Sequence, residues 1–153
     1  MDPSQASTGG LTTFGGVTPI LRVADVQASV DYYTRALGFN VDFFDVIASV
    51  SRDRCSVFLV QGDQGHVGGW VWIGVNDVDA LHAEFRQNGA IIRQKPTNFS
   101  WACEMQVADP DGNVMRIGSD SKPNQPYGPW LDMEGREWEM DANGNWRLGE
   151  RWR

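Results

Sequence analysis

The hydrophobic and polar positions of this chain follow one pattern that occurs twice. Residues 19–26 (PILRVADV) and 71–78 (VWIGVNDV) are short runs rich in β-forming side chains, and both end in Val-x-Asp-Val. The aspartates of the two runs, Asp25 and Asp77, lie 52 positions apart. An internal repeat of this length predicts two copies of one structural module.

A segment with the apolar spacing of a helix follows each aspartate. Apolar residues recur three or four positions apart, at Val26, Val30, Tyr33 and Leu37 in the first segment and at Val78, Leu81 and Phe85 in the second. Asp25 and Asp77 occupy the N-cap positions, where a carboxylate accepts hydrogen bonds from free backbone N–H groups. Gly38 and Gly89 occupy the positions of left-handed C-caps. We therefore expect one helix in each copy.

Three strand-like segments follow each predicted helix. They span residues 40–46, 48–52 and 55–61 in the first copy, and residues 91–95, 104–108 and 114–119 in the second. The glycine-rich segment 62–69 links the copies, and residues 109–113 (DPDGN) form a predicted tight turn. The order β-α-β-β-β, used twice, predicts an α+β fold. Its modules span 17–61 and 70–119, and their helices cover one face of each sheet and leave the other face concave.

Both ends of the chain differ from this repeat. Residues 1–15 are rich in Ser, Thr and Gly and are expected to be a mobile arm. The domain itself is predicted to span 16–120, and a tail rich in Pro and Trp spans 121–153. Within the tail, Asn143-Gly144 predicts a β-hairpin over 136–149. The tail aromatics either pack on the domain or a partner subunit, or form a lid that faces a ligand.

Charge and composition exclude several classes of partner. The formal net charge is −7, which argues against nucleic acid and anionic membranes as partners but permits a cationic ligand. No stretch approaches the apolar length of a transmembrane helix. The first residues lack a secretory leader pattern, and two cysteines do not make a disulfide framework, so we expect a cytoplasmic protein.

Several motifs together resemble those of a known superfamily. They are the helix entry Val23-x-Asp25, the segment Tyr32-Tyr33-x-x-x-Leu37-Gly38-Phe39 and the turn at 109–113. With the repeat, they resemble the vicinal oxygen chelate superfamily, which includes glyoxalase I, extradiol dioxygenases, fosfomycin resistance enzymes and bleomycin resistance proteins. The resemblance covers about residues 17–119. It implies that the two modules form a cupped, barrel-like sheet.

Within that superfamily the chain most resembles the bleomycin resistance proteins. The resemblance lies in residues 70–73 (WVWI) with the helix after them, in residues 51–58 (SRDRCSVF) and in Trp101. It implies a homodimer whose clefts form between subunits and hold a small molecule. The twofold use of one concave module favours the same assembly, because each concave sheet needs a partner.

The resemblance also identifies four positions at which the superfamily enzymes hold a divalent metal. In this chain these positions are Thr18, Phe58, Trp70 and Arg116. A hydroxyl, two aromatic rings and a guanidinium do not grip a divalent cation, and Arg116 would repel it. We therefore expect no metal and no cofactor, and the prediction leans away from an enzyme.

Strand alternation then predicts which side chains face the concave side. Thr18, Phe58, Trp70 and Trp72 share that face, while the β-branched residues between them face the helices. Flat aromatic rings stack on planar ligands and attract cations. The candidate ligand-binding residues are Thr18, Phe43, Asp45, Phe58, Trp70, Trp72, Trp101, Glu104 and Arg116.

These observations favour a metal-free, dimeric binding protein of the bleomycin-resistance type. It would sequester a planar or cationic, antibiotic-like small molecule in an aromatic cleft. One alternative is a glyoxalase-like lyase or isomerase with a non-standard site around Glu104 and Arg116. Another is a structural or regulatory module whose cleft is vestigial.

Overall fold

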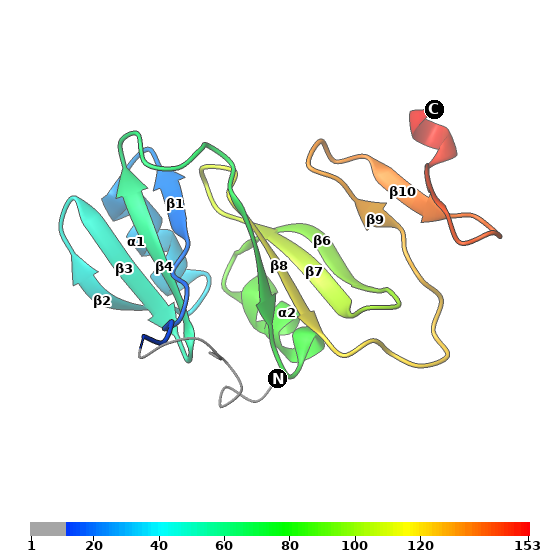
Figure 1. The fold of residues 1–153 in the computed structure, drawn as a ribbon, viewed down its shortest axis with the longest axis horizontal. Coiled ribbons are helices and arrows are strands. Elements are labelled where there is room, and N and C mark those ends of the chain that lie inside the picture. Colours follow the sequence, from blue (N-terminus) through cyan, green and yellow to red (C-terminus); the bar gives the residue numbers. More distant parts are fainter. Residues whose placement is uncertain (1–11) are drawn as a thin grey trace.

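The structure, a computed structural model, describes residues 12–153, so the first eleven residues of the predicted arm lie outside the described residues. The first module contains β1 (Ile20–Val23), α1 (Val26–Arg35), β2 (Asn40–Phe44), β3 (Ile47–Arg52) and β4 (Cys55–Gln61). Its sheet has the order β1-β4-β3-β2 (Figure 1). Strand β1 is parallel to β4, and the other pairs are antiparallel.

The second module repeats this arrangement. It contains β5 (Trp70–Gly74), α2 (Val78–Gln87), β6 (Ile91–Asn98), β7 (Cys103–Ala108) and β8 (Val114–Ser119). The sheet order is β5-β8-β7-β6, with β5 parallel to β8. The predicted α+β class with two β-α-β-β-β modules is therefore confirmed. Four strand ends differ from the prediction. Strand β2 stops at Phe44 and β6 continues to Asn98, while β3 and β7 each begin one residue earlier than predicted.

The predicted helix ends are also confirmed. A carboxylate oxygen of Asp25 accepts the backbone N–H of Ala28 at 3.0 Å, and Asp77 accepts that of Ala80 at 3.0 Å. Gly38 has φ +71°, a conformation that a side chain makes costly and that ends the first helix. Within residues 12–153, neither helix is long or apolar enough to cross a membrane.

One hydrophobic core joins the two modules. Its fully buried members come from the helices and from the helix-facing side of both sheets, and they include Tyr33, Leu37, Leu59, Met105 and Met115. Because the helices and the core occupy this side, the opposite face of each sheet is left without helical cover.

Helix α1 also bonds directly to the second module. The hydroxyl of Tyr32 donates to the backbone oxygen of Ala108 at 2.6 Å and accepts the N–H of Ile91 at 2.9 Å. The hydroxyl of Tyr33 donates to the carboxylate of Asp109 at 3.0 Å. These contacts fix the relative position of the two modules.

An ion pair between β3 and α2 also links the two modules. The guanidinium of Arg52 lies 2.6 Å from a carboxylate oxygen of Glu84 and also donates to the backbone oxygen of Leu37 at 2.9 Å. The hydrogen bond with Glu84 raises the pKa of Arg52, and the same bond lowers the pKa of Glu84. Both side chains are partly exposed, so the pair contributes little stability by itself.

The tail forms a third, smaller sheet beside the second module (Figure 1). It contains β9 (Trp130–Leu131), β10 (Glu137–Met140), β11 (Trp146–Leu148) and a final 3₁₀ turn, η2 (Glu150–Trp152). Strands β10 and β11 form the hairpin expected at Asn143-Gly144. Strand β9 was not predicted, and it pairs with β10 to complete an antiparallel sheet.

Candidate ligand-binding faces

The helix-free faces of both sheets carry the aromatic candidates. In β5, Val71 and Ile73 pack against the core, so Trp70 and Trp72 point to the opposite side. In β4, Val57 and Leu59 are buried in the core, and Phe58 between them points away from it. Strand alternation thus placed these three aromatic residues on the correct face.

A row of small and apolar side chains crosses the open face of module one. Neighbouring strands place Ile20 beside Phe58, Phe58 beside Ser49, and Ser49 beside Phe43. The rings of Phe43 and Phe58 have their centroids 5.9 Å apart, and Phe43 is 51% exposed. This face therefore presents exposed apolar side chains, Ile20 and Phe43, beside the carboxylate of Asp42, which accepts the hydroxyls of Ser49 and Ser51 at 2.9 and 2.7 Å.

Two predicted site residues lie at the margin of this face. Thr18 is half-buried and precedes β1 by two residues. Asp45 is exposed in the turn between β2 and β3, where its N–H donates to the backbone oxygen of Ile47 at 3.0 Å. The structure thus places Asp45 beyond the end of the strand that carries Phe43.

The corresponding row in module two is polar at its centre. Trp72 lies beside Arg116, Arg116 beside Gln106, and Gln106 beside Gln94. Trp72 is 53% exposed, so its ring is available to a ligand or to another surface. Gly74, two residues along β5, leaves room for this ring, because a Cβ there would lie 3.2 Å from it.

Glu104 is bound on both of its carboxylate oxygens. The Arg116 guanidinium donates to them at 2.8 and 3.0 Å, and the indole N–H of Trp101 donates to one of them. The residue is 3% exposed. A bidentate ion pair neutralises both charges, so Glu104 is not a free base poised for proton transfer.

Trp101 lies between β6 and β7 and is part of an aromatic cluster with Phe99 and Trp146. Its ring lies parallel to that of Phe99 at 4.7 Å and meets the ring of Trp146 edge-on at 6.0 Å. Trp146 belongs to the tail, so this predicted site residue also anchors the tail. Contacts between predicted site residues occur within one module at a time, at Phe43–Phe58 and at Trp101–Glu104–Arg116.

The four positions at which the resemblance expects the superfamily's metal do not carry the donors that a divalent cation requires. Thr18, Phe58, Trp70 and Arg116 offer one hydroxyl, two aromatic rings and one positive charge. Among residues 12–153, no group of three or more His, Cys, Asp and Glu side chains is placed to hold a metal ion.

Neither cysteine has the environment of an activated nucleophile. Burial raises the pKa of the Cys55 thiol, and it also raises that of Cys103 despite the opposing charge of Lys122. A thiol with a raised pKa carries little thiolate at neutral pH.

A pocket of about 770 Å³ lies at the junction of the modules. It is bounded by the turn between β3 and β4, by β5 and by α2, and the Arg52–Glu84 pair lies in its wall. Trp72 is the predicted site residue that lines it. The exposed indole of Trp72 and the Arg52–Glu84 pair that links the modules therefore line the same pocket.

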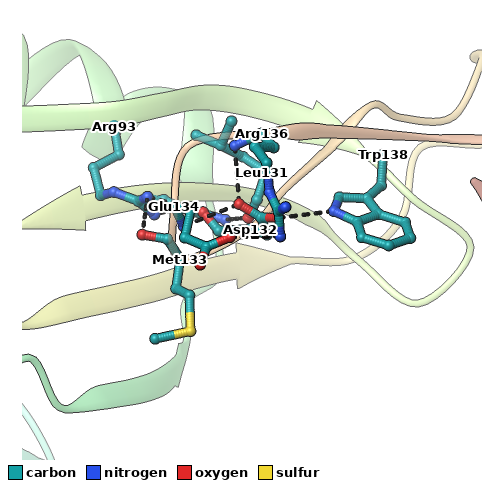
Figure 2. Close-up of polar contacts among 8 residues, drawn as sticks. Arg93, Leu131, Asp132, Met133, Glu134, Arg136 and Trp138 are labelled. Atoms are coloured by element: carbon teal, nitrogen blue, oxygen red, sulfur yellow. Dashed lines mark hydrogen bonds and ion pairs between the residues drawn. The ribbon is translucent and has the colours of Figure 1, made fainter. Parts of the chain in front are cut away.

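Sequence reasoning missed the residues that bind the tail to module two. The guanidinium of Arg93 lies 5.2 Å from the ring centre of Trp70. It also donates to the backbone oxygen of Asp132 at 2.9 Å (Figure 2). The side-chain amide of Gln106 donates to the backbone oxygen of Leu131 at 2.7 Å. The tail therefore lies against part of the face that was expected to be open.

The carboxylate of Asp132 holds together the turn between β9 and β10. It accepts the indole N–H of Trp138, the backbone N–H groups of Glu134 and Arg136, and the guanidinium of Arg136, each at 2.9 Å (Figure 2). Burial of this carboxylate raises its pKa, but the hydrogen bonds outweigh burial and lower the pKa to about 2.

Acid is therefore expected to release this turn. Because the pKa of Asp132 is lower in the folded chain than its ordinary value of 3.8, its stabilising effect is full above about pH 4 and is lost as the pH falls towards 2. The NMR signal of the Trp138 indole N–H should shift over that range. Asp132→Asn should abolish this step. The matched change Asp141→Asn, in the turn between β10 and β11, should leave the pH-dependent shift in place. A Trp138 signal that still shifts with pH in Asp132→Asn would contradict the assignment.

Two β-α-β-β-β modules on one core, with aromatic rings on their helix-free faces, define the class of this protein. A sequence model of the glyoxalase/bleomycin resistance protein/dioxygenase superfamily matches residues 13–117, more than two thirds of the chain. The chain belongs to this superfamily. The match ends before the tail.

Solved structures agree with this assignment. The bleomycin-binding protein of Streptomyces verticillus, solved with copper(II)-bleomycin, is 26% identical with a TM-score of 0.58, over 73% of this chain and 100% of that one. TnmS3, an antibiotic-binding protein from Streptomyces sp. CB03234, is 24% identical with a TM-score of 0.60, over 72% and 99%. TioX from Micromonospora sp. ML1 is 21% identical with a TM-score of 0.62, over 69% and 98%. No curated protein matches the chain at a significant level.

Proposed function

We propose that this chain is a metal-free small-molecule binding protein of the bleomycin-resistance type. It sequesters a planar or cationic, antibiotic-like ligand on the aromatic faces of its two sheets. The similarity to proteins named for binding bleomycin and another antibiotic supports this class of ligand. The net charge of −7 favours a cation over an anion.

The observation that carries the proposal is the Glu104–Arg116 pair. The resemblance assigns Arg116 to one of the four positions that hold metal in the superfamily enzymes, and its charge is already neutralised by Glu104, which is 3% exposed. A site built this way favours binding over lyase or isomerase chemistry, because it offers neither metal donors nor a free base.

A homodimer completes the proposed site. The open face of module one exposes the apolar side chains of Ile20 and Phe43 to water in a single chain. A second copy that covers this face would bring Phe58 and Phe43 towards the Trp72 side of its partner. The aromatic rings would then form the two walls of a cleft between subunits.

Binding of bleomycin, and of a panel of planar cationic antibiotics, tests the proposal by calorimetry. Trp72→Ala should weaken binding tenfold to a hundredfold, as expected for an aromatic anchor, and should leave the unfolding free energy nearly unchanged because the ring is exposed. A panel in which no compound binds would contradict the proposal.

The neighbouring residue provides the matched control. Ile73 packs against the core from the other face of β5, so Ile73→Ala should lower the unfolding free energy by about 2 kcal/mol and leave affinity intact. If Ile73→Ala weakened binding while Trp72→Ala did not, the ligand would lie on the wrong side of the sheet for this proposal.

A further inference from the structure

The tail and module two border a second pocket, which is shallow and open to solvent. It has a volume of about 440 Å³, and its apolar lining consists of Trp70 from β5 together with Trp130, Met133 and Trp138 from the tail. Three of the seven tryptophans of the chain thus meet in one place. Two of the three belong to the part of the chain beyond residue 117, where the superfamily match ends.

The indole rings offer carbon surface to this pocket. Trp130 and Trp138 meet edge-on with their centroids 6.5 Å apart. The N–H of Trp138 is already bonded to Asp132 at 2.9 Å, so the polar end of this ring is occupied. A pocket walled by indole carbon favours a flat ring that can stack on or against it.

The charged residues of the pocket are bonded to one another. The guanidinium of Arg136 lies 2.9 Å from the carboxylate of Asp132 and 2.5 Å from that of Glu134. Because these charges are satisfied within the tail, the rim does not require a charged ligand. The chemistry of the site is therefore set by its aromatic lining.

Arg93 holds the two walls at a fixed distance. Its guanidinium lies 5.2 Å from the centre of the Trp70 ring. The same group donates to the backbone oxygens of Asp132 and Met133 at 2.9 and 3.4 Å (Figure 2). It also bonds to the side-chain oxygen of Gln106. One side chain thus ties β6, β7 and the tail to Trp70, and the pocket is formed before any ligand arrives.

We propose that this pocket is a subsite for a flat aromatic ring system, and that the tail supplies two of its three indole walls. The inference rests on the proposed function in one respect, that the chain binds small molecules. It assigns the tail a role in recognition that the superfamily match does not cover. The volume suits a ring system of two or three fused rings.

The test uses the full chain and two neutral probes of similar size. One is 2-naphthol, which is flat, and the other is decahydro-2-naphthol, which is saturated and puckered. Two-dimensional NMR separates the indole N–H signals of the seven tryptophans. We expect 2-naphthol to shift the signals of Trp70, Trp130 and Trp138, and decahydro-2-naphthol to bind at least fivefold more weakly.

Two variants test the walls directly. Trp130→Leu should weaken 2-naphthol binding about fivefold to tenfold, because it removes a ring and keeps an apolar side chain. Trp152→Leu, in the same tail but outside the pocket lining, should leave it unchanged. Should Trp130→Leu disturb the tail, Trp130→Phe provides a second variant that keeps a smaller aromatic ring at the wall, and it should weaken 2-naphthol binding by less than Trp130→Leu.

Each outcome decides the inference separately from the proposed function. If 2-naphthol shifts the three indole signals but no antibiotic binds, the subsite stands and the proposed function fails. If antibiotics bind through Trp72 but neither naphthol probe shifts the three signals, the subsite is refuted alone. Equal binding of the two probes would also refute the subsite. So would indole shifts on dilution of the protein without probe, because these would mean that a second copy fills the pocket.

Discussion

Replacement of Asn113 by alanine is expected to lower the free energy of unfolding by about 3 kcal/mol. Asn113 is 1% exposed, and its side chain links the linker, β1 and the turn before β8. Its amide donates to the backbone oxygen of Arg22 at 3.0 Å and to Asp109 at 2.9 Å, and its oxygen accepts the N–H of Gly69 at 2.9 Å. Alanine would remove all three bonds, so the part-buried N–H of Gly69 and backbone oxygen of Arg22 would lose this partner, while Asp109 would keep its hydrogen bond from Tyr33.

Urea denaturation measures this loss, and Asn143→Ala is the matched control. Asn143 is exposed in the hairpin turn of the tail, so its replacement should change the unfolding free energy by less than about 0.5 kcal/mol. Equal losses in the two variants would mean that the turn 109–113 does not join the modules. A larger loss for Asn113 assigns the sequence motif Asp-Pro-Asp-Gly-Asn a structural role in holding β1 against the second module.

The secondary structure could be predicted because its signals are local. Asp25 and Asp77 mark helix starts by the hydrogen bonds that their own side chains make, three residues along the chain. Alternation in β5 placed Trp72 and Ile73 on opposite faces from their order alone. Strand β9 escaped prediction because two residues are too few to show alternation.

The candidate site was less accessible because its contacts are distant in sequence. The pairing of Glu104 with Arg116 depends on the register of β7 and β8, which brings residues twelve positions apart onto one face. The contact of Arg93 with the tail depends on an irregularity in β6 between Ile92 and Gln94, and on the turn after β9, which lies 39 and 40 positions further along the chain. The tryptophan cluster of the tail was visible in the sequence, but its neighbours were not, because Trp146 packs on Phe99 and Trp101 and the other tail rings share a pocket with Trp70 only through the fold.

The second large effect concerns assembly. If the homodimer forms through the open face of module one, Phe43→Asp should raise its dissociation constant at least a hundredfold, about 3 kcal/mol, and give a single chain of 17.1 kDa at micromolar concentration. The reason is that a carboxylate would have to leave water to enter an apolar contact. Light scattering after size-exclusion chromatography measures the mass directly.

Phe44 provides the control for that experiment, because it follows Phe43 in the same strand. Phe43 is 51% exposed and Phe44 is 47% exposed. Phe43 contacts Phe58 on the open face, whereas Phe44 pairs with Ala48, which is fully buried. Phe44 therefore points to the other side of the sheet, and Phe44→Asp should leave the dimer intact. A wild-type chain that is monomeric, or a dimer that Phe44→Asp dissociates as readily as Phe43→Asp, would place the subunit contact elsewhere and would separate the cleft from the open face of module one.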